Sequence, residues 1–223
     1  SETHSYRKGD RYRDIAIKRS VKKAVRRGHL ALELSDLEAH ARESKGSLNI
    51  VYAIDASGSM KGQKIEMAKK AGIALAFRAI ESKDKVGLIV FSKEIKEAIA
   101  PTLDFGLLLR TITTVRAALE TDFVAMIDKA IALFPYDHST KHLLILSDAL
   151  PTSGNAPEEE TITACGVARG NGITISLIGI NLDAKGEKLA RRITQIGEGR
   201  FYVVRNVNEL DRLVLEDYYS ISS

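Results

Sequence analysis

The sequence predicts an α/β fold: a doubly wound, mostly parallel open sheet of six strands, with helices on both faces and one antiparallel edge strand. From about residue 47 onward, short runs rich in β-branched residues alternate with longer segments of helical periodicity, a pattern typical of βαβ units. The run 48–54 is apolar at nearly every position, as expected of a central strand that is covered on both faces. Asp55 and Asp148 each follow such a run directly, which places both at the carboxyl edge of the sheet, where this class of fold binds ligands.

The strands are predicted from short apolar runs that end at turn-forming residues. A more polar run, 94–99, stops just before Pro101, so we expect it to be the edge strand, paired with 86–91 in a hairpin. The predicted strands are 48–54, 86–91, 94–99, 142–146, 173–180 and 200–204.

The helices are predicted from apolar residues at helical spacing. In the first of them, Ile65, Ala68 and Leu75 mark the buried side, and the lysines Lys64, Lys69 and Lys70 are left for solvent. The predicted helices are 63–80, 105–115, 122–134, 158–169, 184–196 and 208–219.

Composition indicates a globular protein in a reducing compartment. The chain has 223 residues, of which 44% are hydrophobic and 28% are charged, which is ordinary for a folded domain. Its single cysteine, Cys165, cannot form an internal disulfide, so we expect a cytoplasmic location. No apolar run reaches the roughly 18 residues of a membrane span, and we expect no membrane partner. The chain begins at Ser1 without an initiator methionine, which favours a fragment of a longer protein.

A basic extension precedes the main domain. Residues 1–30 hold ten Lys or Arg and three acidic residues, a net charge of +7, whereas the rest of the chain carries −3 and the whole chain +4. Ile17, Val21, Ala24 and Val25 recur at helical spacing among these cations, which predicts a short amphipathic helix. Either its apolar stripe packs on the domain, or its basic face binds acidic partners or nucleic acid. We therefore expect an extension over 1–46 and a domain over 47–223.

The segment Asp55-Ala56-Ser57-Gly58-Ser59 places three oxygen-bearing side chains where a buried strand ends. Because they alternate, their oxygens can converge, and Gly58 supplies the conformational freedom that the turn needs. Magnesium prefers six oxygen ligands in an octahedral array. The same pattern also serves helix N-capping, so in isolation it does not establish a metal site.

At these residues the chain resembles the von Willebrand factor A (vWA) family, from about residue 48 to the C-terminus. The metal-ion-dependent adhesion site of that family uses Asp-x-Ser-x-Ser, a threonine before a central helix, and an aspartate after a later strand. The resemblance implies that Ser57, Ser59 and Thr121 bind Mg²⁺ (or Mn²⁺) directly, while Asp55 and Asp148 act through waters or hydrogen bonds. It also implies an open coordination position for a Glu or Asp carboxylate of a protein partner.

Two positions depart from the family pattern, which often has glycine before the threonine and after the last aspartate. This chain has Glu120 and Ala149 there. Glu120 could add a ligand or repel an acidic partner, so it is a candidate modulator. For Thr121 and Asp148, a helix N-cap and a turn residue are the alternatives.

A second, shorter resemblance concerns partners. The run 35–38, with Arg42 and Glu43 and then 48–60, is similar to the segment before the metal motif in the magnesium-chelatase D subunit. Such proteins act beside ring-forming AAA+ ATPases, so the resemblance implies an AAA+ ATPase as a partner and a non-enzymatic role for this domain.

Two other functions remain open. A metal-dependent phosphoryl hydrolase would need a general acid two residues after Asp55, where Ser57 stands, and the glycines Gly58 and Gly62 are too close for a phosphate-binding loop. Nucleic-acid binding through the extension would be electrostatic and sensitive to salt, since few aromatic residues accompany the cations. The five histidines form no pair at metal-ligand spacing, and we expect most of them at the surface or in hinges: His4, His29, His40, His138 and His142.

Overall fold

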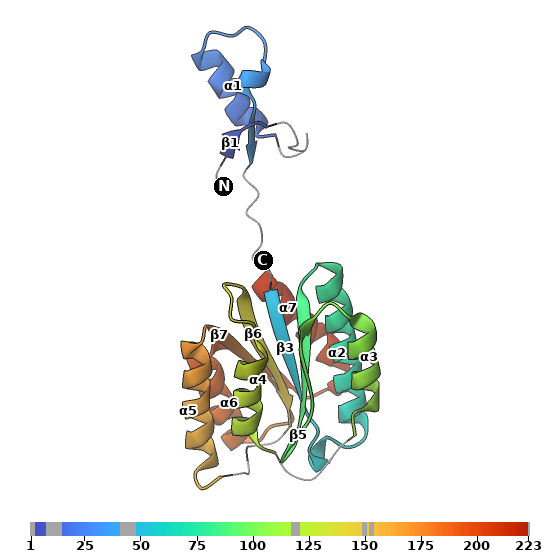
Figure 1. Ribbon diagram of the computed structural model, residues 1–223. Helices are drawn as coiled ribbons and strands as arrows, with labels where there is room; N and C mark the ends of the chain where they lie inside the picture. Colours follow the sequence, from blue (N-terminus) through green and yellow to red (C-terminus); the bar gives the residue numbers. More distant parts are fainter. Residues whose placement is uncertain are drawn as a thin grey trace. The chain divides into compact units, whose positions relative to one another are not determined.

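The computed structural model describes residues 3–7, 15–40, 48–116, 121–148, 151 and 154–222. It divides the chain into two compact units, Ser1–Lys45 and Gly46–Ser223 (Figure 1). The larger unit contains the predicted sheet, and the smaller one contains the predicted basic helix.

The sheet of the larger unit has six strands: β3 (Leu48–Asp55), β4 (Lys85–Phe91), β5 (Ile95–Thr102), β6 (Thr140–Ser147), β7 (Ile173–Ile180) and β8 (Glu198–Val204). Their order across the sheet is β5-β4-β3-β6-β7-β8. All neighbouring pairs are parallel except β4 and β5, which are antiparallel. The prediction of a doubly wound, mostly parallel sheet with one antiparallel edge strand is therefore confirmed.

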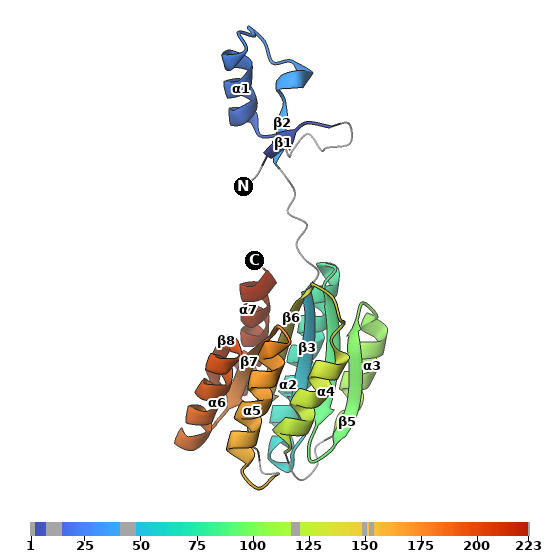
Figure 2. The same cartoon turned by 60° about the vertical axis from the view of Figure 1, so that its left-hand side comes forward.

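Helices cover both faces of the sheet, as Figures 1 and 2 show. Because β3 is buried at every position, its side chains supply both cores: Ile50, Tyr52 and Ile54 point to one face, and Val51 and Ala53 to the other. The first face packs against α2 (Gln63–Glu81), α3 (Phe105–Thr114) and α7 (Leu210–Ser222), and the second against α4 (Phe123–Leu133), α5 (Pro157–Gly170) and α6 (Ala184–Ile196).

The edge strand β5 is longer than predicted. It continues through Pro101 to Thr102, whereas the sequence predicted an end before the proline. An edge strand can include proline, because only one side of such a strand must supply backbone donors. Opposite this segment, a Cβ on Gly87 would lie 2.7 Å from the carbonyl oxygen of Ile99, so the close approach of the two strands requires glycine there.

His142 is an exception to the expectation that most of the histidines lie at the surface or in hinges. It lies in β6 with 1% of its side chain exposed, and its Nε2 atom is 2.7 Å from Oδ2 of Asp217 on α7, which is equally buried. A polar residue can be buried inside a sheet when it has a hydrogen-bond partner, and here that partner comes from 75 residues further along the chain.

The smaller unit contains two short strands that the sequence did not predict. β1 (Thr3–Ser5) and β2 (Glu38–His40) pair antiparallel, beside α1 (Ile17–Arg26) and the 3₁₀ turn η2 (Leu34–Asp36). The helix is present as predicted. The buried residues of α1 are Ser20 and Ala24. The other apolar residues of the predicted stripe are exposed: Ile17, Val21 and Val25.

Candidate metal site

The candidate site lies where the strand order reverses. From β3 the chain proceeds to β4 on one side, and it later returns to β6 on the other. Asp55 is the last residue of β3, and Asp148 follows the last residue of β6, so both lie at the carboxyl edge of these neighbouring strands, the lower edge of the sheet in Figure 1. Side chains from adjacent parallel strands can converge at such a point, which is where doubly wound folds bind ligands.

Asp55 is fully buried and organises the turn that follows it. Its Oδ1 atom accepts a hydrogen bond from the backbone N–H of Ser57 at 2.8 Å, and its Oδ2 atom accepts one from the hydroxyl of Ser147. The backbone N–H of Ala56 donates to the carbonyl of Phe91 at 2.8 Å, which extends the pairing of β3 with β4 beyond the strand. The start of the loop is therefore held by both neighbouring strands.

The two serine hydroxyls lie at a spacing that suits a magnesium ion. Ser57 Oγ and Ser59 Oγ are 3.0 Å apart. Adjacent ligands of an octahedron with bonds of 2.0–2.1 Å lie about 2.8–3.0 Å apart, so this pair has the separation of two neighbouring ligands. The hydroxyl of Ser59 also donates to Asp148 Oδ1 at 2.6 Å. Asp148 thus accepts a hydrogen bond from a candidate ligand, as expected of an aspartate that supports a metal site by orienting one of its ligands.

Thr121 lies at the same edge, but it is not the N-cap of its helix. Asp122 has that role, because its side chain accepts the backbone N–H of Ala125 at 3.0 Å. The N–H of Asp122 in turn donates to the carbonyl of Ser92, just after β4, at 2.9 Å. Thr121 itself is buried, and with the N-cap alternative removed, it stays a candidate ligand. Glu120 and Ala149 lie outside the described residues.

Lys64 belongs to this site, although the sequence placed it in solvent. It is in the first turn of α2, and its ammonium group forms an ion pair with Asp148 Oδ2. The side chain of Lys64 is 30% exposed and that of Asp148 only 1%. Of the other two lysines on this helix, Lys70 is exposed as predicted, and Lys69 is largely covered and pairs with Glu66. No local pattern could identify Lys64, since its partner is 84 residues away.

The electrostatic environment of Asp55 suits the binding of a cation. Burial raises the pKa of its carboxyl group to about 6, against hydrogen bonds from Ser147 and Ser57 that lower it. The nearby charge of Asp148 raises the pKa of Asp55 further. Desolvated carboxylates beside neutral hydroxyls favour a positive ion, so the donor set fits Mg²⁺ or Mn²⁺.

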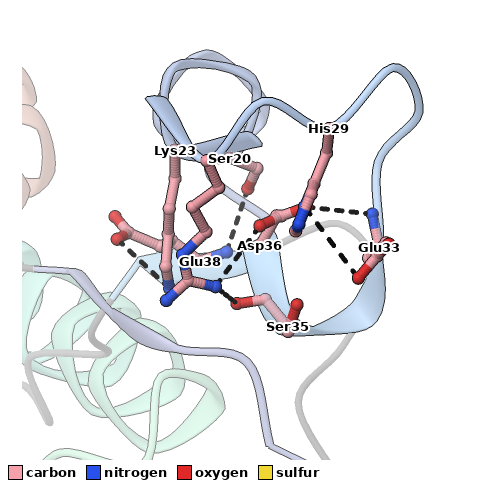
Figure 3. Close-up of polar contacts among 8 residues, drawn as sticks. Ser20, Lys23, His29, Glu33, Ser35, Asp36 and Glu38 are labelled. Carbon is pink, nitrogen blue, oxygen red and sulfur yellow. Dashed lines mark hydrogen bonds and ion pairs between the residues drawn. The ribbon is translucent and has the colours of Figure 1, made fainter. Parts of the chain in front are cut away.

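A second group of potential metal ligands lies in the smaller unit, where Figure 3 shows His29, Glu33 and Asp36 close together. Asp36 already has its partners: its carboxylate accepts His29 Nδ1 at 2.7 Å, the backbone N–H of Glu33 at 3.2 Å and the guanidinium of Arg27 at 3.4 Å. Glu33 and Asp36 also form the capping box of η2. These contacts account for the cluster as an ion-paired turn without a metal.

The fold and this edge define the larger unit as a doubly wound α/β domain of the kind that binds ligands at a switch point. The sequence profile of the von Willebrand factor type A domain matches residues 49–216. The chain therefore belongs to the vWA family.

Solved structures of low sequence identity share the fold. The conserved hypothetical protein BatB from Bacteroides thetaiotaomicron is 19% identical, with a TM-score of 0.65 over 79% of this chain and 99% of that one. The vWF domain of the type V pili tip protein Mfa5 from Porphyromonas gingivalis is 14% identical, with a TM-score of 0.65 over 79% and 96%. The SpRpn10 VWA domain is 14% identical, with a TM-score of 0.62 over 77% and 95%.

One finding bears on membranes. Among the residues that the structure describes, no helix combines the length and the apolar character that crossing a membrane requires.

Proposed function

We propose that the chain is a metal-dependent protein-binding module, in which Asp55, Ser57, Ser59, Thr121 and Asp148 hold Mg²⁺ or Mn²⁺ and the ion takes a carboxylate from a partner protein. The observation that carries the proposal is the chain of contacts from Asp55 through Ser57 and Ser59 to Asp148, at the reversal of the strand order. It joins residues 89 positions apart in the sequence around two hydroxyls at octahedral spacing.

A binding role agrees with the chemistry of this donor set better than a catalytic one does. Neutral hydroxyls leave the charge of a divalent ion largely uncompensated, so the bound ion would attract an additional anionic ligand. The side chain two residues after Asp55 is the hydroxyl of Ser57, which cannot act as the general acid of a phosphoryl hydrolase. We therefore propose a partner that offers an Asp or Glu side chain, and no turnover by this domain.

The resemblance of 35–38, Arg42-Glu43 and 48–60 to the run that leads into the metal motif of magnesium-chelatase D subunits suggests one kind of partner. We propose that this partner is an AAA+ ATPase or an assembly that contains one. On this proposal the domain acts inside the cell, as a non-catalytic component whose attachment to the complex depends on the metal.

Metal binding is tested first, by calorimetric titration of the purified chain with Mg²⁺ and Mn²⁺. The variant Ser57→Ala removes a proposed ligand and should weaken affinity by roughly 10–100-fold, the range found when groups that support a metal site are lost. The matched control is Ser35→Ala, which removes an exposed hydroxyl from the smaller unit. If the wild-type chain binds neither ion, or if the two variants behave alike, the proposed site is wrong.

Partner binding is tested by co-purification from the native cell, with Mg²⁺ in one sample and a chelator in the other. The expected result is a protein that is retained by the wild-type chain only with metal, and that is lost with Ser57→Ala but retained with Ser35→Ala. Mass spectrometry then shows whether it is an AAA+ ATPase. A partner retained equally in chelator would contradict capture through the metal.

A further inference from the structure

The ion pair between Lys64 and Asp148 puts a fixed positive charge beside the candidate metal site. Asp148 is held at both oxygens, because Ser59 Oγ donates to Oδ1 at 2.6 Å while the ammonium of Lys64 binds Oδ2. The carboxylate is almost fully buried, so it makes these contacts with little competition from water. Lys64 is thus joined to a proposed metal ligand, Ser59, through one carboxylate.

Lys64 stands at a position where local preferences disfavour a cation. It is the second residue of α2, and the N-terminal end of a helix carries a partial positive charge that favours acidic side chains. Glu66, in the same turn, has the preferred sign. The lysine therefore gains nothing from its own helix, and its attraction to Asp148 offsets the unfavourable position.

The charges at the site show what this lysine changes. Among the described residues bonded to one another there, Asp55 and Asp148 bring two negative charges and Lys64 one positive charge. A divalent ion would leave the set at +1 with the lysine and neutral without it. The lysine thus repels the free ion, and it gives the loaded site the net charge that attracts a carboxylate.

We propose that Lys64 is a specificity-determining residue of this site: it positions Asp148 and lowers the affinity for free metal, while it raises the affinity of the metal-loaded site for an anionic ligand. This inference rests on the proposed function. Its consequence is that the ion and the partner's carboxylate bind cooperatively, since each supplies the charge that the other needs. The lone domain would then hold its ion weakly until a partner arrives.

The test compares Lys64→Met, which removes the charge and keeps the length of the side chain, with Lys64→Arg, which keeps the charge. Lys70→Met is the matched control, because it removes an exposed lysine from the same helix, six residues away. In water-like screening, the Coulomb repulsion between a single positive charge and a divalent ion a few Å away lowers the affinity for the ion by a factor on the order of ten. We expect Lys64→Met to bind Mn²⁺ about tenfold more tightly than the wild-type chain, and Lys64→Arg and Lys70→Met to stay within about threefold of it.

The second readout uses acetate as the carboxylate probe. The paramagnetic relaxation of its methyl protons by Mn²⁺ bound to the full chain reports binding at the loaded site. Acetate has half the charge of the metal, so its affinity should fall by about threefold in Lys64→Met. The two affinities therefore move in opposite directions, which a purely structural role of Lys64 would not produce.

Two outcomes would overturn the inference, and they can be told apart. If the wild-type chain binds no Mn²⁺, the proposed function fails and this inference fails with it. If the wild-type chain binds Mn²⁺ and Lys64→Met leaves both affinities unchanged or moves them the same way, only the role of Lys64 is wrong. If Lys64→Met does not fold, as judged by circular dichroism, Lys64→Gln replaces it, and Lys64→Arg must still bind Mn²⁺ like the wild-type chain.

Discussion

The buried pair between His142 on β6 and Asp217 on α7 should be a main determinant of how firmly the last helix is held. Their side chains are 1% exposed, and Nε2 and Oδ2 are 2.7 Å apart. Within the described residues, His142 Nδ1 and Asp217 Oδ1 have no hydrogen-bond partner. If one of the two residues is removed, the other therefore has no second side-chain hydrogen bond to rely on. In Asp217→Ala, the imidazole would be left in the core without any partner.

The burial of the pair sets how much free energy of unfolding its loss costs. Removing one member of a buried, hydrogen-bonded pair costs about 3–5 kcal/mol, against a total stability of about 5–15 kcal/mol for a domain. Asp217→Asn keeps an acceptor for His142 and should cost nearer the 0.5–1.5 kcal/mol of one hydrogen bond. Replacing both residues by leucine removes both polar groups together, so the double variant should recover much of the loss of Asp217→Ala.

The free energies are measured by urea denaturation followed by far-UV circular dichroism. Glu216→Ala is the control, because its side chain is 50% exposed and its ion pair with Arg212 is at the surface, where such pairs contribute about 0–1 kcal/mol. If Asp217→Ala costs no more than Glu216→Ala, the pair does not hold the helix and the reasoning is wrong. A double leucine variant less stable than Asp217→Ala would show that the loss came from packing.

Three further outcomes are expected. Gly72→Ala should cost about 1–3 kcal/mol in the same denaturation assay, because its Cβ would lie 2.6 Å from the Tyr52 ring; a variant as stable as the wild type would contradict the packing. The hydrogen bond to Asp36 raises the pKa of His29 above 6.5 and lowers that of Asp36 below 3.8, so the pair stabilises the smaller unit between these limits and is lost as pH rises through the His29 pKa or falls through that of Asp36. The nuclear magnetic resonance titration of His29 should therefore move toward 6.5 in Asp36→Asn, and an unchanged midpoint would refute the pair. Burial raises the pKa of Cys165 to about 12, so its thiol should resist iodoacetamide at pH 8 until urea unfolds the domain, and rapid labelling of the native protein would contradict that burial.

The sheet could be predicted because its signals are local and repeated. Each central strand is a short apolar run, and each helix shows its own periodicity, so errors at one boundary do not affect the next. The prediction failed at Pro101, where the position of β5 at the edge of the sheet overrides the usual effect of proline. It also missed β1 and β2, because three-residue polar strands that pair across more than 30 residues leave no periodicity to detect.

The candidate site could be predicted only in part, for a related reason. Asp55, Ser57 and Ser59 form one continuous motif, and Asp148 follows a recognisable strand. By contrast, the helical spacing around Lys64 distinguishes buried from outward positions, and Lys64 does face outward from α2. Its partner is set by the topology, which brings Asp148, directly after β6, beside the first turn of that helix.

The same contrast explains why a charge that supports binding is harder to predict than a ligand. A ligand must have a particular chemistry at a fixed point on the backbone, so it leaves a motif. A compensating charge acts over several Å and can come from any element that reaches the site, so its position is constrained in space and not along the chain. Lys64 and the pair of His142 with Asp217 share this property, since each is a charged or polar residue whose partner is supplied by a distant segment. In this chain, the residue proposed to set the strength of the candidate metal site therefore lies beside Asp148, where the first turn of α2 meets the end of β6.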